Sequence, residues 1–154
     1  MNTKPDQAAE TFKNGFNCAQ AVFTTYAEEL SMDRTSALKI SCGFGAGMGR
    51  RQEVCGAVSG AILLIGCKHG KTIREDKAAN ELTYKLVREL SDKFIAKHGS
   101  ISCKELLGCN LLTPEGQQFY KENNCRDLKC APYVHDAAEL AENMLRKNQE
   151  NDRL

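Results

Sequence analysis

The chain has 154 residues, of which 42% are hydrophobic and 27% are charged, and its formal net charge is +1. This length and composition are typical of one folded domain, and they argue against intrinsic disorder over most of the chain. The near balance of 21 basic and 20 acidic residues argues against nucleic-acid binding, which needs an excess of Lys and Arg. We therefore expect residues 1–154 to form a single domain with no nucleic-acid partner.

Cysteine is the unusual component, with eight residues in the chain. The first residues contain no apolar signal-peptide core, and the longest apolar stretch, from Val54 to Cys67, is shorter than the ~20 residues that cross a bilayer. These features predict a cytoplasmic protein with no membrane insertion. Because cytoplasmic thiols are kept reduced, we expect metal binding, catalysis or redox cycling rather than a disulfide framework.

The N-terminal third of the chain predicts two helices and a glycine-rich connection. Apolar residues recur at helical spacing over residues 18–30, and the side chain of Asn17 can cap this helix. A shorter helix is predicted near residues 33–40. The run Gly43–Gly49 has glycine at every second position, so we expect a loop or tight connection rather than a helix interior.

The middle of the chain predicts a buried helix followed by an amphipathic one. Residues 53–66 are apolar on nearly every face, which is typical of a helix at the centre of a core. Gly56 and Gly60 share one face of that helix and would let a neighbouring helix approach closely. A long helix with apolar residues every three or four positions is predicted over residues 74–97, with Gly99 as its stop.

The C-terminal third predicts short elements and a final helix. Residues 104–107 are expected to form one helical turn, and a further helix begins at Thr113, followed by proline at its first position. Residues 125–130 are predicted to be a short polar connection, and the last helix begins near Pro132. No segment shows strand-like alternation. The predicted fold is an all-α, single-domain helical bundle with a buried central apolar helix.

The cysteines lack any Cys-x-x-Cys spacing, so the common local motifs of zinc ribbons and thioredoxin-like sites are absent. Cys42 and Cys67 are interpreted as small buried hydrophobic residues. Four other cysteines lie at or near predicted helix starts, where the helix dipole favours a thiolate. These are Cys18, Cys55, Cys103 and Cys130. Four thiolates suit an iron-sulfur cluster or zinc, but spacing alone leaves simple buried thiols equally open.

Two other features are candidate functional sites. The glycine run with Arg50 and Arg51 could bind phosphate, but it lacks the preceding strand and the Gly-Lys-Ser/Thr ending of such loops. We favour the interpretation that the glycine run is a tight connection that brings Cys55 close to other backbone. A third interpretation is that the run donates hydrogen bonds to the sulfurs of a cluster. His135, five residues after Cys130, is considered as a proton donor or ligand at the thiol site.

Several segments, in order along nearly the whole chain, together resemble one known family. They are Asn17-Cys18-Ala-Gln-Ala-Val, Gly43-Phe-Gly-Ala-Gly-Met-Gly-Arg50, Glu53-Val-Cys55-Gly-Ala-Val-Ser-Gly60, Ser102-Cys103-Lys-Glu-Leu-Leu-Gly108 and Cys130-Ala-Pro-Tyr-Val-His-Asp-Ala-Ala. This combination resembles the redox-active C_GCAxxG_C_C family, which is named for its Cys-Gly-Ala-x-x-Gly motif with single cysteines elsewhere.

The resemblance implies a set of site residues. The four signature cysteines of the family correspond to Cys18, Cys55, Cys103 and Cys130, as cluster ligands or as a redox-active thiol set. Cys109 or Cys125 could replace Cys103 or Cys130, because each lies close to one of them in sequence. A related domain occurs in split-Soret cytochrome c, which carries haem and an iron-sulfur cluster, and this relation favours a 2Fe-2S cluster. Covalent haem is not expected, since the chain lacks Cys-x-x-Cys-His.

Three functional hypotheses follow. The first is a cytoplasmic redox protein that binds an iron-sulfur cluster through the four cysteines, for electron transfer or redox sensing with an unknown redox partner. The second is a metal-free thiol-disulfide oxidoreductase in which two of the same cysteines cycle. The third is a zinc-stabilised structural or interaction domain, for example a homodimer joined through apolar helix surfaces.

Overall fold

Helices make up most of the computed structural model, which describes the backbone of residues 2–151 and the side chains of residues 2–146. The α-helices are α1 (Lys4–Lys13), α2 (Cys18–Ala27), α3 (Arg34–Cys42), α4 (Gly45–Met48), α5 (Gly56–His69), α6 (Lys77–His98), α7 (Cys103–Leu107), α8 (Pro114–Glu122) and α9 (Ala131–Asn151). A 3-10 turn, η1 (Glu28–Leu30), follows α2, and a π-helical turn, η2 (Arg126–Cys130), precedes α9. The described residues contain no strand, and the all-α prediction is confirmed.

Local sequence signals explain where several helices begin. The Asn17 side chain accepts a hydrogen bond from the Gln20 N–H, and the Gln20 side chain accepts one from the Asn17 N–H. This reciprocal capping box fixes the first turn of α2. Thr113 caps α8 more simply, because its hydroxyl oxygen accepts a hydrogen bond from the Gly116 N–H, and Pro114 stands at the first helical position. The capping predictions at both residues are confirmed.

Helix α5 lies at the centre of the core, packed against α2, α6 and α9. Val58, Leu64 and Ile65 are completely buried, so the prediction of a central apolar helix is confirmed, although the helix begins at Gly56 rather than residue 53. Gly60 allows α2 to pack closely, because a Cβ atom at Gly60 would lie 2.7 Å from the Ala19 carbonyl oxygen.

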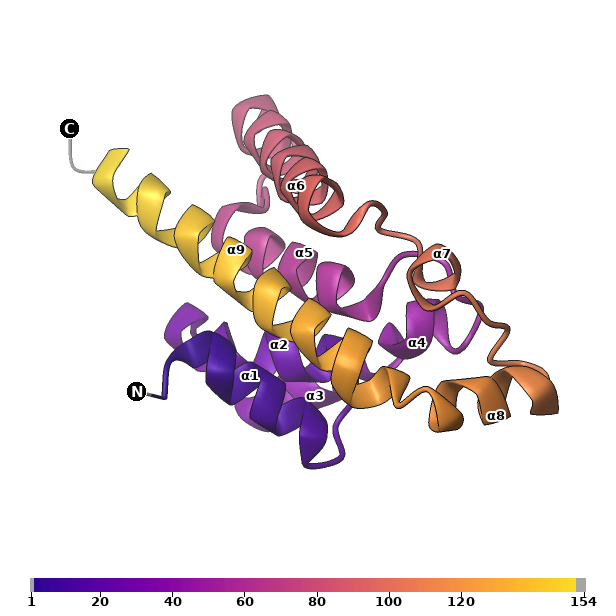
Figure 1. Cartoon of the computed structure of the whole chain (residues 1–154). Coiled ribbons are helices and arrows are strands. Elements are labelled where there is room, and N and C mark those ends of the chain that lie inside the picture. Colours follow the sequence, from indigo (N-terminus) through magenta and orange to yellow (C-terminus); the bar gives the residue numbers. More distant parts are fainter. Residues whose placement is uncertain (1, 152–154) are drawn as a thin grey trace.

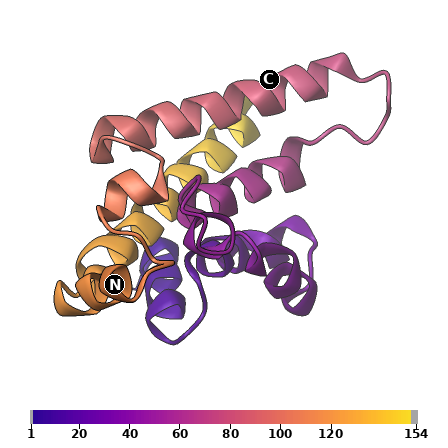
Figure 2. The ribbon, with the colours of Figure 1, turned by 90° about the vertical axis from the view of Figure 1, so that its right-hand side faces the viewer.

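Figure 1 shows two regions, one made of the long helices around α9 and one made of the short helices near its beginning. Helix α9 crosses the molecule with α1 and α6 on either side of it, and α4, α7 and α8 gather toward the end where α9 begins. Figure 2 shows α6 lying along α5, to which residues 70–76 connect it. No helix among the described residues is both long enough and apolar enough to cross a membrane.

The prediction of a polar connection over residues 125–130 is wrong. Residues Arg126–Cys130 form η2, and the Ala131 N–H donates to the Arg126 carbonyl five residues earlier. Helix α9 therefore begins at Ala131, one residue before Pro132, without an intervening loop. The sequence predicts a helix start near Pro132 because proline has no N–H to donate and is tolerated in the first turn of a helix. The polar residues before it are therefore interpreted as a loop. Such π-turns are frequent at functional sites.

Candidate functional site

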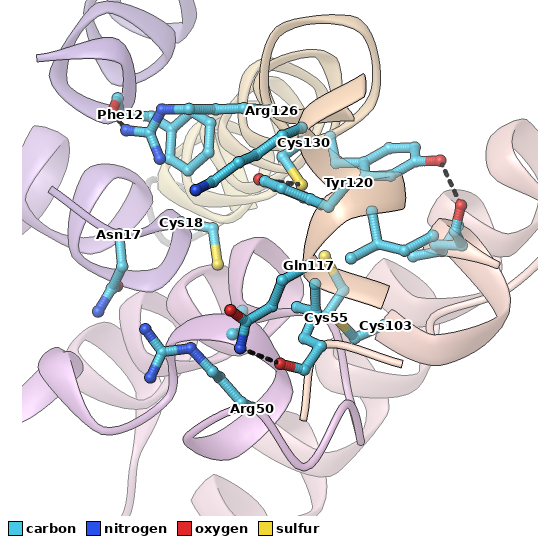
Figure 3. Close-up of a pocket in the computed structure, with 17 residues that line it drawn as sticks. Phe12, Asn17, Cys18, Arg50, Cys55, Cys103, Gln117, Tyr120, Arg126 and Cys130 are labelled. Carbon is cyan, nitrogen blue, oxygen red and sulfur yellow. Dashed lines mark hydrogen bonds between the residues drawn. The ribbon is translucent and has the colours of Figure 1, made fainter. Parts of the chain in front are cut away.

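A cavity of about 360 Å³ opens at the end of the molecule where α4, α7 and α8 gather. Its wall contains Cys18, Cys55, Cys103 and Cys130, which come from four separate segments (Figure 3). We call this cavity the thiol pocket. The remaining lining residues are Phe12, Asn17, Ala46, Arg50, Gly56, Leu106, Leu107, Leu111, Gln117, Tyr120, Lys121, Arg126 and Tyr133.

Cys18 is the first residue of α2 and packs against the start of α5. The capping box at Asn17 fixes its backbone. Gly56 makes room for the thiol, because a Cβ atom at this position would overlap the Cys18 sulfur and lie 2.9 Å from the Phe44 carbonyl oxygen. Only glycine therefore lets α5 begin this close to Cys18, which explains the glycine directly after Cys55.

Cys55 and Cys103 are held next to each other by backbone hydrogen bonds. Val54 and Ser102 form an isolated antiparallel bridge. The Cys55 N–H donates to the Ile101 carbonyl at 2.7 Å, and the Cys103 N–H donates to the Glu53 carbonyl at 2.7 Å. The sequence carries no signal for this pairing, because a bridge of single residues has no strand periodicity.

The glycine run covers one side of the pocket, and its short element α4 is a left-handed turn rather than a regular α-helix. The φ angles of Ala46, Gly47, Met48, Gly49 and Arg50 lie between 53° and 71°. The backbone of Ala46 hydrogen-bonds to the Cys18 thiol. A Cβ atom at Gly47 would lie 2.8 Å from the Cβ of Cys103, so this glycine is needed for close approach as well as for its positive φ. The expected tight connection is confirmed.

Gln52 joins two parts of the pocket wall, and the sequence gives no indication of this role. Its side chain is buried, donates to the Cys109 carbonyl at 2.8 Å and accepts from the Leu111 N–H at 2.8 Å. It also hydrogen-bonds to Cys103. Gln52 also has a left-handed φ of 57°, but Arg51 separates it from the left-handed turn.

Cys130 is the last residue of η2, and the Tyr120 hydroxyl donates to its sulfur at 3.6 Å (Figure 3). Cys130 lies directly before α9, as predicted, but it also ends η2, so that helical backbone extends from Arg126 through it into α9. The prediction is also confirmed for the other three cysteines: Cys18 and Cys103 are first residues of helices, and Cys55 directly precedes α5.

The family comparison covers the whole of this site. The sequence model of the family described as "Putative redox-active protein (C_GCAxxG_C_C)" matches residues 16–144, which include the four cysteines of the thiol pocket. The chain belongs to this family. Comparison with curated proteins and with solved structures gives no match. Membership agrees with the resemblance found in the sequence and with a redox-active protein as the functional class.

Burial raises the pKa of each cysteine in the thiol pocket. It raises the pKa of Cys103 to about 12 and the pKa of Cys130 to about 11, and repulsion from the neighbouring thiolates adds to both shifts. The pKa values of Cys18 and Cys55 are also raised, mainly by burial. At neutral pH the four groups are therefore thiols unless a cation compensates their charge.

The remaining four cysteines lie outside the thiol pocket. The prediction that Cys42 and Cys67 are buried is wrong, because both are exposed, at the last residue of α3 and near the end of α5. Cys125 is fully buried and Cys109 is partly exposed in a small apolar cluster beside Cys103 and Cys130. Neither lines the pocket.

His135 turns away from the thiol pocket. Its Nδ1 atom lies 3.1 Å from Asp136 and its Nε2 atom lies 3.4 Å from Asp6, so the proposed approach to Cys130 is not observed. His135, Asp136 and Glu139 have ligand atoms within 4.8 Å of one another, a grouping that their spacing on one helix could have revealed. The Asp136 carboxylate, however, already pairs with Lys97 at 3.1 Å and His98 at 2.9 Å.

Proposed function

We propose that this protein binds an iron-sulfur cluster through Cys18, Cys55, Cys103 and Cys130 and serves in electron transfer or redox sensing. The observation that supports this most is the meeting of four thiols from four segments in one cavity. Four cysteine thiolates are the usual ligand set of 2Fe-2S and 4Fe-4S clusters. A bound cluster would supply one-electron cycling of iron, and the split-Soret resemblance favours the 2Fe-2S type.

The spacing of the sulfurs supports a cluster over a single zinc ion. Tetrahedral zinc with bonds of about 2.3 Å requires sulfur atoms about 3.8 Å apart. Among the residues that the structure describes, no three cysteine sulfurs lie within 4.8 Å of one another. A cluster of several metal ions spans a wider set of ligands, so the arrangement fits the proposed group better than it fits zinc.

The surrounding residues have defined roles in this proposal. The backbone around Ala46 and the start of α5 donate hydrogen bonds to Cys18, and the N–H groups of Ala57 and Val58 face Cys55. Tyr120 donates to Cys130. Such donors stabilise negative charge on sulfur and thereby raise a cluster's reduction potential. The apolar side chains of Leu106 and Leu111 limit access of water to the thiols.

A metal-free thiol-disulfide oxidoreductase is less well supported. The attacking group in disulfide exchange is the thiolate, and burial raises the pKa of all four pocket thiols. Reactive cysteines of such enzymes have lowered pKa values, so that the thiolate forms near neutral pH. The pocket thiols suit a metal-compensated state instead.

The test is anaerobic purification and reconstitution with iron and sulfide, followed by absorption and electron paramagnetic resonance spectra and by quantitation of both elements. We expect stoichiometric iron and sulfide, and loss of the chromophore when any pocket cysteine is replaced by serine. Cys42→Ser and Cys67→Ser are matched controls, because both thiols are exposed outside the pocket. A colourless protein, or equal losses in the controls, would contradict the proposal.

A further inference from the structure

Three cationic side chains line the thiol pocket together with the cysteines. They are Arg50 from the left-handed turn, Lys121 from α8 and Arg126 from η2. Among the described residues, no carboxylate lines the pocket. Within the described part of the chain, no ion pair involves any of these three groups. The pocket therefore concentrates positive charge that the folded chain itself does not neutralise.

Arg126 is held in place without using up its donors. Its guanidinium donates to the Phe12 carbonyl and its central carbon lies 4.2 Å from the centre of the Phe12 ring. A guanidinium carries five N–H donors, and this contact occupies one of them. Figure 3 shows Arg126 and Arg50 on opposite sides of Cys18. The two groups could approach one ligand from different directions.

Arg50 differs from its neighbour Arg51 in a way that points to the pocket. Arg51 lies 3.7 Å from the Glu53 carboxylate and does not line the pocket, whereas Arg50 does. Arg50 also has a φ of 71°, a left-handed conformation that costs a residue with a side chain roughly 1–2 kcal/mol. The strained turn thus directs one of two adjacent arginines to the thiols. This neighbouring pair gives the experiment its control.

We propose that the thiol pocket binds a small anion bearing carboxylate or phosphate oxygens, which Arg50, Lys121 and Arg126 hold beside the cysteines. The proposal rests on the proposed function in taking this pocket as the redox centre, and it adds the chemical class of the ligand. Guanidinium groups pair with carboxylate and phosphate through two parallel hydrogen bonds. Arg50 and Lys121 are exposed at the pocket's edge, so a solute can reach them.

The shape of the site favours a small molecule over a protein partner. A concave cavity of about 360 Å³ is within the ~300–1,000 Å³ typical of small-ligand pockets. Apolar side chains, among them Leu107 and Leu111, lie in the same wall as the cations. A ligand with a short carbon chain between anionic groups would contact both kinds of surface.

Calorimetric titration under reducing, anaerobic conditions tests the proposal. Inorganic phosphate and succinate are the two anionic probes, and uncharged succinamide is the control ligand. We expect saturable binding of at least one anion, no binding of succinamide, and affinity lowered about tenfold or more in Arg50→Gln, Lys121→Gln and Arg126→Gln. Arg51→Gln should bind the anion as the unaltered protein does.

The titration is performed on both the metal-free and the cluster-loaded protein, so that the two proposals are tested separately. A cluster without saturable anion binding would overturn the anion site alone, and anion binding without any cluster would overturn the proposed cofactor alone. Equal losses in Arg51→Gln would overturn the assignment to these side chains. Because Arg126 also contacts Phe12, thermal unfolding shows whether Arg126→Gln is still folded. Arg50 and Lys121 are exposed, so their variants test anion binding without a loss of packing.

Discussion

The core around α5 and the wall of the thiol pocket are built on different principles. In the core, regular helices meet through small residues and fully buried aliphatic side chains such as Val58 and Leu64. In the wall, the chain forms a left-handed turn, an isolated β-bridge and a π-turn, and these direct the four thiols. The regular core therefore supports irregular backbone, which places the chemically active groups.

The core and the pocket wall contribute to the free energy of folding with opposite signs. Burial of each large aliphatic side chain in the core contributes about 1.5–3 kcal/mol. Each left-handed residue with a side chain, such as Ala46 or Met48, costs roughly 1–2 kcal/mol. Such strain persists only where the surrounding structure compensates for it, and it clusters at functional sites. Adding a Cβ atom at a closely packed glycine of the core should therefore destabilise the protein, whereas removing one from a left-handed residue of the wall should stabilise it.

The largest effect is expected for Gly60→Ala in the core. The new Cβ atom would lie 2.7 Å from the Ala19 carbonyl oxygen, so α2 and α5 must separate, and we expect a loss of about 2–3 kcal/mol in the free energy of unfolding. Gly66→Ala in the same helix has nothing within 4 Å of the added atom and should gain roughly 0.5–1 kcal/mol. Urea unfolding measures both, and equal effects would contradict the close packing.

Asp136→Asn tests the polar contacts of the core at the junction of α6 and α9. Its carboxylate has a side-chain exposure of 13% and pairs with Lys97, His98 and His135. Hydrogen bonds to charged groups contribute roughly 1.5–3 kcal/mol, so we expect a loss of about 2 kcal/mol at neutral pH. The measurement is urea unfolding as a function of pH.

The sign of the pH dependence follows from the pKa of Asp136. Burial alone raises this pKa, but hydrogen bonds from His135 and Lys97 outweigh burial and hold it below the ordinary 3.8. The folded state therefore binds fewer protons than the unfolded state in this range, and its stabilisation is complete above about pH 4 and decreases as the pH falls through the lowered pKa. Asp136→Asn should remove this part of the acid dependence. An unchanged profile would show that other carboxylates cause it.

The core and the pocket wall also differ in how far the sequence predicts them. Helical periodicity and capping residues give α2, α5, α6 and α8 close to their observed bounds, because these signals are local. Periodicity could not give the Val54–Ser102 bridge or the role of Gln52, since both depend on contacts between segments far apart in the chain. The π-turn that ends at Cys130 is not predicted, because the polar residues of this segment are typical of a loop. Positions at predicted helix starts selected the four cysteines, and the family motif assigned them to one site.

Met48→Gly should stabilise the wall, in contrast to the added methyl group in the core. Met48 has a φ of 67° and a side chain that is 42% exposed, so glycine relieves strain with little loss of packing. After the entropic cost of glycine is subtracted, we expect a gain of about 0.5–1 kcal/mol in the free energy of unfolding. Met48→Ala is the matched control, because it shortens the side chain but keeps the strain. Equal stabilities of the two variants would show that the turn is unstrained.

Tyr120→Phe is expected to have the smallest effect on stability and a specific effect on the redox centre. The substitution keeps the ring and removes the hydroxyl that donates to Cys130 at 3.6 Å. A donor to a thiolate ligand stabilises the reduced, more negative cluster, so its loss should lower the reduction potential. One hydrogen bond of about 0.5–1.5 kcal/mol corresponds to roughly 20–60 mV for a one-electron couple. Anaerobic potentiometric titration measures the shift.

The metal-free protein gives an independent measurement of the same hydrogen bond. Burial raises the pKa of Cys130, and the bond from Tyr120 partly opposes that increase, so Tyr120→Phe should raise this pKa further. Alkylation of Cys130, followed by peptide mass spectrometry, should then require a higher pH than in the unaltered protein. Tyr84→Phe is the control, because Tyr84 is 55% exposed on α6, outside the thiol pocket. If both variants alkylate alike, the Tyr120 hydroxyl does not act on Cys130, and the wall tunes its thiols through the backbone alone.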